Sequence, residues 1–174
     1  GVIHEEKFKE IQNIEKKNTE TVIYRESTIF LDPRSKKLGG RILSSLEKLH
    51  LTIKKLNLKI VSHENYFKKA YYCGIPIKGI ENLKDQLFGL EANFEQLLAI
   101  DFKKGCFIGQ ENTARMKLKN KLRRRLLPII ASKELKIGDE LKYENKKIGK
   151  VLINKPFPFA LVNLFNPDFS VFKD

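Results

Sequence analysis

Apolar and polar residues alternate along the first part of the chain with two different periods, which predicts both helices and strands. Segment 4–16 is highly charged and carries apolar residues three positions apart, a spacing typical of an amphipathic helix. Segments 21–24 and 28–31 are rich in β-branched and aromatic residues and predict strands. A turn is predicted at 32–35, because its proline fixes φ and Asp32 can accept a backbone hydrogen bond.

Two further helices are predicted between residues 42 and 73. Segment 42–49 carries apolar residues at helical spacing from Ile42 onward. Ser62 is a suitable N-cap for a helix over 63–73, which Gly74 ends.

The pattern changes near the end of the chain, where short apolar runs are separated by turn residues. Prolines at three later positions exclude a long helix there. Closely spaced short strands predict a small β-barrel or sandwich over 121–174, preceded by an α+β region over 1–120, with the boundary in the basic segment 116–124. The runs are 126–131, 141–143, 147–153, 159–165 and 169–172.

Composition adds limits on the class of protein. With 174 residues, 41% hydrophobic and 32% charged, the chain can bury a core, and no apolar run approaches the roughly 20 residues of a membrane helix. We expect no membrane contact and no secretory leader. Cys73 and Cys106 do not form a disulfide framework, and the three histidines show no metal-ligand spacing with them, so a reducing, cytoplasmic setting is expected, with no metal site.

The net charge of +13 has two interpretations. Lysines spread along the chain beside many Ile and Asn residues indicate a compositional excess, which we favour for the total. Segment 117–125 is a better candidate for a basic patch that binds nucleic acid weakly. Its positive residues are Lys117, Lys119, Lys121, Arg123, Arg124 and Arg125.

The stretch 103–111 has the composition of a reactive thiol loop. Cys106 lies between two glycines and beside two lysines, and a helix-compatible segment follows. Nearby cations and a helix N-terminus both stabilise a thiolate. The same spacing also allows Cys106 to pack as a small apolar residue while the lysines are solvated, and no histidine is placed beside it as a base.

Glu91 is a second candidate group. A carboxylate can accept two parallel hydrogen bonds from a ring N–H and an adjacent amine, as pterins and guanines present them. By composition alone, a surface carboxylate at a helix start is the commoner arrangement.

Four ordered blocks resemble the YgfZ family of folate-binding proteins, which support iron–sulfur cluster assembly and repair and are structural relatives of the aminomethyltransferase of the glycine cleavage system. The similarity runs from about residue 20 to the end and corresponds to the C-terminal part of a family member. The blocks include Asp32-Pro33-Arg34, Gly74-Ile75-Pro76, Glu91-Ala92-Asn93 and Lys104-Gly105-Cys106-Phe107-x-Gly109-Gln110-Glu111.

The resemblance implies a fold, a cofactor and a set of partners. The fold would be the remainder of an aminomethyltransferase-like folate-binding domain over 1–120, followed by a C-terminal β-barrel over 121–174. The cofactor would be tetrahydrofolate. The partners would be iron–sulfur enzymes, including those that modify tRNA, or cluster-assembly proteins, and the protein would not itself turn over a substrate.

The resemblance also implies roles for particular residues. Cys106 would be the functional thiol, and Glu91, Asn93 and Arg115 would contact the folate. The loop around the thiol would be shaped by Lys104, Gly105, Gly109, Gln110 and Glu111.

Two alternatives stay open from the sequence. One is an aminomethyltransferase-type enzyme that acts on a folate adduct, although the motif cysteine argues against it. The other is a tRNA-binding module that uses the basic segment 117–125 and the expected barrel, although no RNA-recognition signature accompanies that segment.

Overall fold

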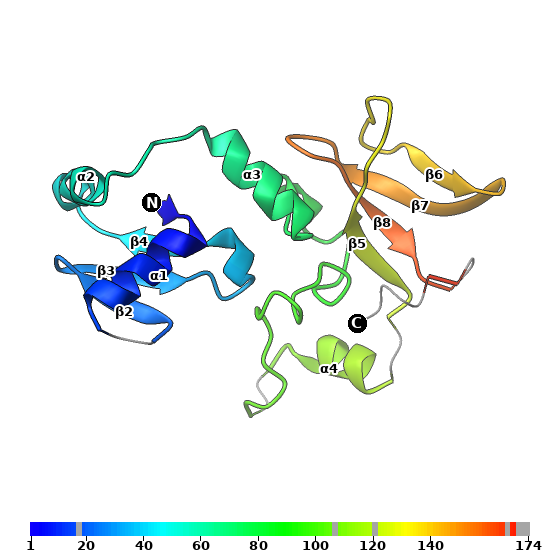
Figure 1. Ribbon diagram of the computed structural model, residues 1–174. Helices are drawn as coiled ribbons and strands as arrows, with labels where there is room; N and C mark the ends of the chain where they lie inside the picture. Colours follow the sequence, from blue (N-terminus) through cyan, green and yellow to red (C-terminus); the bar gives the residue numbers. More distant parts are fainter. Residues whose placement is uncertain (17–18, 106–107, 120–121, 166–167, 170–174) are drawn as a thin grey trace. The chain divides into compact units, whose positions relative to one another are not determined.

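The chain forms two compact units, Gly1–Lys69 and Ala70–Asp174. Figure 1 shows the helices and strands of each unit in a computed structural model. The structure describes residues 1–16, 19–105, 108–119, 122–165 and 168–169.

The first unit is built on a four-stranded antiparallel sheet with the strand order β1-β4-β3-β2. Both strands expected from the β-branched runs are present, and two more are added at their side. Helix α1 (Glu5–Ile14) connects the short β1 to β2. The strands are β1 (Val2–Ile3), β2 (Thr21–Tyr24), β3 (Ser27–Leu31) and β4 (Gly40–Leu43).

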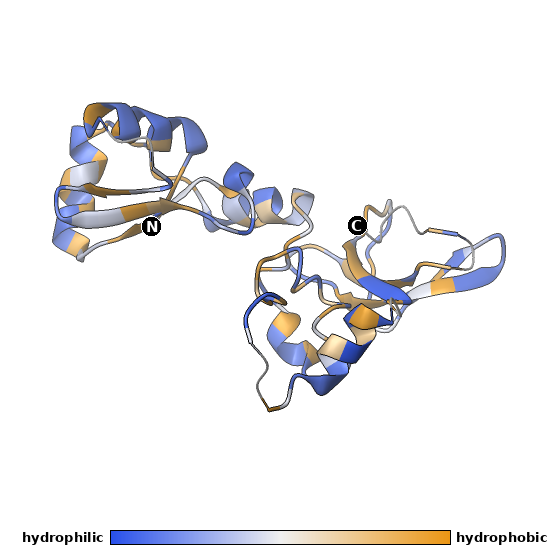
Figure 2. Ribbon diagram, turned by 90° about the horizontal axis from the view of Figure 1, so that it is seen from below, coloured by the Kyte–Doolittle hydropathy of each residue, from blue (hydrophilic) through white to orange (hydrophobic). Residues whose placement is uncertain are grey.

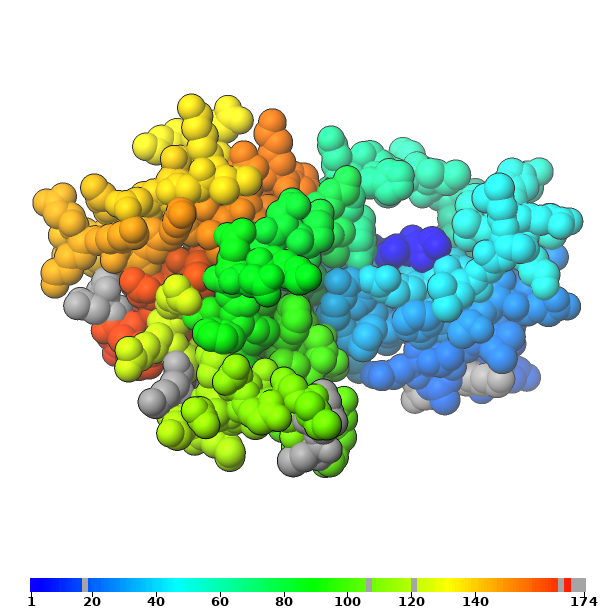
Figure 3. All heavy atoms as spheres, turned by 180° about the vertical axis from the view of Figure 1, so that it is seen from behind, coloured from blue at the N-terminus to red at the C-terminus, as the bar shows by residue number. Residues whose placement is uncertain are grey.

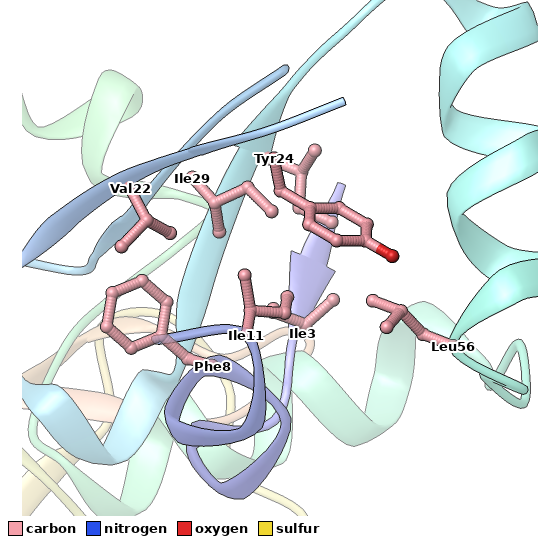
Figure 4. Close-up of a cluster of buried hydrophobic side chains, with 8 residues drawn as sticks. Ile3, Phe8, Ile11, Val22, Tyr24, Ile29 and Leu56 are labelled. Atoms are coloured by element: carbon pink, nitrogen blue, oxygen red, sulfur yellow. The ribbon is translucent and has the colours of Figure 1, made fainter. Parts of the chain in front are cut away.

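The core of this unit lies between α1 and one face of the sheet. Phe8 and Ile11, which the three-residue spacing placed on one helix face, are fully buried against Val22 and Ile29 of the sheet. Figure 4 shows these side chains pointing toward one another, with Leu56 closing one end of the cluster. Burial of several such side chains, at about 2 kcal/mol each, is what holds the helix on the sheet.

The expectation of helix from residue 42 is wrong at its start. Ile42 lies in β4, where it pairs with Ile29 and is 3% exposed. Helix α2 (Leu46–Lys55) begins only after Ser45, whose side chain accepts a hydrogen bond from the Lys48 N–H. The apolar spacing across this junction fits both structures, and pairing with β3 decides for the strand. A one-turn 3-10 helix, η1 (Lys36–Leu38), precedes β4.

Helix α3 (His63–Tyr72) follows the predicted range closely. Ser62 accepts a hydrogen bond from the Glu64 N–H, as expected of an N-cap. Gly74, at φ 72°, ends the helix in the left-handed conformation that glycine adopts at little cost.

The second unit contains another four-stranded antiparallel sheet, with the order β5-β8-β7-β6. Strands β6 and β7 form a hairpin whose turn residues, Glu144 and Asn145, both have positive φ, and Figure 2 shows that this tip is hydrophilic. Before the sheet come the 3-10 helix η2 (Ile80–Leu83) and α4 (Glu111–Leu118). The strands are β5 (Arg124–Pro128), β6 (Glu140–Tyr143), β7 (Lys146–Ile153) and β8 (Phe159–Asn163).

The main core of the second unit joins the end of α3 and the loop after it to this sheet. Tyr71 and Leu83 pack with Leu126 and Phe159, and the Tyr71 hydroxyl donates a 2.6 Å hydrogen bond to the Ile129 carbonyl. In the space-filling view of Figure 3, the green segment that contains residues 80–100 lies against the orange strands of the sheet.

The expected C-terminal β-barrel is not confirmed. Strands β5 and β6 are the two edges of the sheet, and no pairing closes them within the described residues. The protein is therefore a mixed α and β structure with two antiparallel sheets. The domain boundary expected after residue 120 falls inside the second unit. That residues 1–120 and 121–174 fold as separate domains stays a prediction.

Candidate functional site

The residues of the predicted thiol loop lie on both sides of a gap in the description. Cys106 and Phe107 are outside the described residues. Lys104 and Gly105 are exposed before the gap. After it, Gly109 has φ 93°, and its N–H donates a 3.3 Å hydrogen bond to Oε1 of Glu111.

Helix α4 starts where the sequence indicated a helix after the thiol loop. Its first residue is Glu111, and Gln110 is at the N-cap position without a side-chain capping bond. Free N–H groups at a helix start favour a nearby anion. The structure therefore gives the thiol loop a helix start within a few residues of the cysteine, as the sequence predicted.

Glu91 is a buried carboxylate and not the surface carboxylate that is commoner by composition alone. It is 4% exposed. Its Oε1 accepts a 2.9 Å hydrogen bond from Nε of Arg124, and its Oε2 accepts from Nη2 of Arg124 at 3.3 Å and from the Phe88 N–H at 3.0 Å. These charge-assisted bonds offset the cost of burying the charge.

The backbone brings these partners together. The carbonyl of Glu91 accepts a 2.8 Å hydrogen bond from the Leu126 N–H, so the loop over 88–93 runs beside the edge strand β5. Arg124 is the first residue of β5 and thus lies across from Glu91, although the two are 33 positions apart in sequence.

A hollow of about 660 Å³ opens beside this ion pair. It brings together Glu91 and Arg115, two of the three residues predicted to bind a cofactor. Three arginines and one glutamate line it, so the lining carries a net positive charge, while Phe88 and Met116 add apolar surface. The lining residues are Phe88, Glu91, Asn112, Arg115, Met116, Arg123, Arg124 and Asn163.

Asn93, the third predicted cofactor ligand, does not line this hollow. It is 8% exposed and has φ 63°, and its Nδ2 donates a 2.7 Å hydrogen bond to the Leu126 carbonyl. Its Oδ1 is buried without a hydrogen-bond partner in the described part of the chain. In this arrangement Asn93 fixes the loop to β5.

The basic segment 117–125 is partly engaged within the protein. Lys117 forms a 2.6 Å ion pair with Glu95 and lies over the Phe102 ring, at 5.6 Å from its centroid. Arg124 is bound to Glu91, and Arg125 is 4% exposed. These three residues present less positive charge to an outside polyanion than the sequence suggested, and nucleic-acid binding stays a prediction.

The first unit holds a second cluster, which sequence reasoning did not find. Asp32 is 2% exposed and accepts hydrogen bonds from the side chains of Arg34 and Arg41. Burial opposes ionisation of this carboxyl, but the hydrogen bonds from the two arginines outweigh it and lower its pKa to about 2. The sequence predicts Asp32 as a turn residue that accepts a backbone hydrogen bond, and the 3.1 Å bond that Asp32 accepts from the Arg34 N–H confirms this.

Among the residues that the structure describes, no three His, Cys, Asp or Glu side chains lie close enough to hold a metal ion. Within the same residues, no helix is both long and apolar enough to cross a bilayer.

Known proteins give an independent comparison. No family model matches the chain. Over 114 residues, 66% of its length, it is 32% identical to the iron-sulfur cluster assembly factor IBA57 homolog, mitochondrial, of Pyricularia oryzae. It is 31% identical over 62% of its length to the homolog of Dictyostelium discoideum, and 32% identical over 56% to the mitochondrial IBA57 factor of Homo sapiens.

The chain is therefore similar to iron–sulfur cluster assembly factors, the general class of protein that the family resemblance implied. It covers 29%, 26% and 27% of these three relatives, so it spans less than a third of their length. The relatives carry the name IBA57 and not YgfZ.

The expectation of a cytoplasmic protein is wrong. The three relatives are all named as mitochondrial proteins, which points to the mitochondrion instead. The expectation came from the cysteine pattern, which reports reducing conditions but does not distinguish between the compartments that provide them.

Proposed function

We propose that this chain is part of a mitochondrial iron–sulfur cluster assembly factor that supports [4Fe–4S] enzymes. We also propose that the hollow beside α4 and β5 binds tetrahydrofolate, and that the thiol of Cys106 takes part in the work on clusters. Partners would be cluster-assembly proteins or the recipient enzymes. The similarity to factors of that name supports the role in assembly.

The folate proposal rests on the observation that Glu91 and three arginines line the same hollow. Oε1 of Glu91 accepts a single hydrogen bond in the described structure, so one of its lone-pair directions is left for a ring N–H or amine. Guanidinium groups suit the carboxylates at the other end of a folate. The exposed ring of Phe88 offers apolar area to a flat heterocycle.

The donors and acceptors of the hollow thus fit a folate. Glu91 would hold the pterin, and Arg115 and Arg123 would hold the carboxylates. When bound, tetrahydrofolate supplies a reduced ring that can carry a one-carbon unit. The residues of this chain would bind and orient it, with Arg124 holding the Glu91 carboxylate in place through two hydrogen bonds.

The proposed role of Cys106 rests on the charges and on the helix near it. Lys103 and Lys104 precede the cysteine, and α4 begins five residues after it. Both features favour the thiolate, which is the form that binds iron or exchanges with a disulfide. The comparison of Cys106 with Cys73, which directly follows α3, tests this.

Folate binding is tested by titrating the 174-residue chain with tetrahydrofolate in a calorimeter under anaerobic conditions. Arg115→Gln removes a charge from the hollow, and no hydrogen bond or ion pair links Arg115 to another side chain in the described residues. We expect about a tenfold loss of affinity, which corresponds to one charge-assisted hydrogen bond. Lys133→Gln, an exposed lysine outside the hollow, is the matched control for net charge.

Equal affinities of the Arg115→Gln and Lys133→Gln variants would reject the hollow as the folate site. Absence of saturable binding by the wild-type chain would reject folate binding by this part of the protein. The thiol is tested separately, in cells that depend on the complete gene. Cys106→Ser should lower the activity of [4Fe–4S] enzymes while Cys73→Ser does not, and equal activities would remove Cys106 from the proposal.

A further inference from the structure

The cluster around Asp32 in the first unit has more hydrogen-bond donors than it uses. Oδ1 of Asp32 accepts from Nε of Arg34 at 3.0 Å and from the Arg34 N–H at 3.1 Å. Its Oδ2 accepts from Nη2 of Arg34 at 2.9 Å and from Nε of Arg41 at 2.8 Å. Each carboxylate oxygen therefore has two donors, and the carboxylate has no acceptor capacity left.

Tyr66 on α3 joins the same cluster as an acceptor. Its hydroxyl oxygen accepts from Nη2 of Arg34 at 3.1 Å and from Nη2 of Arg41 at 3.2 Å. With both lone-pair directions engaged by the guanidinium groups, the hydroxyl proton must point away from them. No acceptor for that proton is found among the described residues.

The unused donors belong to groups that reach solvent. The Arg34 and Arg41 side chains are 24% and 36% exposed, whereas the Asp32 side chain is 1% exposed. Neither Nη1 group donates a hydrogen bond to the described residues. Asp32 on the inside thus holds two guanidinium groups in fixed orientations, with their Nη1 edges and the Tyr66 hydroxyl left for a partner.

Charge leads to the same conclusion. Within the described residues, two arginines face one carboxylate, and Tyr66 is the other titratable side chain in hydrogen-bond contact with them, so the cluster keeps a net charge of +1. A contact that only fastened α3 to the sheet would be balanced by one arginine and one carboxylate. The second arginine adds a positive charge and an Nη1 group for which the described residues provide no acceptor.

We propose that Arg34, Arg41 and Tyr66 form a binding site for an oxyanion, a phosphate or carboxylate group that the two guanidinium groups and the phenol bind together. Planar guanidinium groups match the geometry of both anions, and fixing them in advance lowers the entropic cost of binding. The site lies in the first unit and does not depend on the proposed folate site in the second.

The experiment follows the arginine Nε–H signals of the ¹⁵N-labelled 174-residue chain by NMR during titration with inorganic phosphate. Ionic strength is held constant so that general screening does not change. We expect the Arg34 and Arg41 signals to shift together and to saturate. Arg41→Gln should weaken the apparent affinity about tenfold, because one charge-assisted contact is lost while Arg34 still holds Asp32 at two points.

Two further variants separate the site from charge and from folding. Lys59→Gln removes one positive charge from an exposed position in the same unit and should leave the affinity unchanged within about twofold, as expected of an unspecific surface charge. Tyr66→Phe should weaken binding by a smaller factor than Arg41→Gln. Well-dispersed amide spectra of every variant show that it has folded.

A second titration with glutarate identifies the kind of oxyanion. Tighter saturation by phosphate assigns the site to phosphorylated ligands, and tighter saturation by glutarate assigns it to carboxylates. Shifts that stay linear for both anions, or equal affinities of Arg41→Gln and Lys59→Gln, overturn the proposal and leave the cluster as a purely structural contact.

Discussion

Two buried carboxylates, one in each unit, are held by arginine in different ways. Asp32 accepts four hydrogen bonds, three from arginine side chains and one from the backbone. Glu91 accepts three, two from Arg124 and one from the Phe88 N–H. Both are almost fully buried, at 2% and 4% exposed, so burial alone does not separate them.

The difference lies in which partner has unused capacity. At Asp32 the carboxylate is saturated and the arginines have donors left, so the cluster can bind an anion. At Glu91 one carboxylate oxygen has a lone pair left beside the hollow, so the site can also accept a hydrogen bond from a ligand. A buried carboxylate–arginine pair therefore points to a ligand only after its donors and acceptors have been counted.

The largest expected effect is the loss of Asp32. Asp32→Ala leaves two partly buried guanidinium groups without their counter-ion, and we expect unfolding by urea to require about 4 kcal/mol less free energy. Glu20→Ala breaks the exposed pair of Glu20 with Lys36 and is the control, with a far smaller loss. Equal losses in the two variants would show that the Asp32 cluster does not stabilise the first unit.

Loss of Glu91 should cost somewhat less. Glu91→Ala leaves the Phe88 N–H and the Arg124 guanidinium without the carboxylate that accepts their hydrogen bonds. The Arg124 side chain is 43% exposed, however, and can form hydrogen bonds with water instead. We expect a loss of about 3 kcal/mol in the same urea experiment. Glu95→Ala, which breaks the more exposed pair with Lys117, should cost less, and the reverse order would contradict the structural importance of the buried pair.

The pH dependence of stability isolates the charge of Asp32. Its pKa is about 2 in the folded protein against 3.8 ordinarily, so its ionised form is favoured by folding. The resulting stability, about 2 kcal/mol, is fully present above about pH 4 and is lost as the pH falls toward 2. The difference in unfolding free energy between the wild type and Asp32→Asn should shrink over that window, and a difference independent of pH would contradict the lowered pKa.

The sequence predicted elements whose signals are local. The strands over 21–24 and 28–31, the Ser62 cap and the helix start after the thiol loop are all decided by residues close to one another in the chain. The start of the helix after β4 could not be placed, because the apolar spacing near Ile42 fits a helix and a strand equally, and only pairing with Ile29 decides.

The partners of the two carboxylates needed the fold. Arg124 meets Glu91 because β5 runs beside the loop over 88–93, and nothing within a short window of sequence shows this. For Asp32 a signal was present, since Arg34 follows it closely, but the turn was sufficient to explain both residues. The contribution of Tyr66, 32 positions beyond Arg34, depends on the placement of α3 within the first unit.

The smallest expected effect tests whether Asn93 holds the loop over 88–93 on β5 or contacts the ligand. Asn93→Gly removes the hydrogen bond to the Leu126 carbonyl, while glycine keeps the positive φ without strain. We expect a loss of about 1 kcal/mol in unfolding free energy and no change in tetrahydrofolate affinity, because Asn93 does not line the hollow. Asn57→Gly is the matched control, since Asn57 also has positive φ but is exposed, and it should change neither quantity. A fall in folate affinity in the Asn93 variant alone would instead place Asn93 in contact with the ligand, as the family resemblance implies.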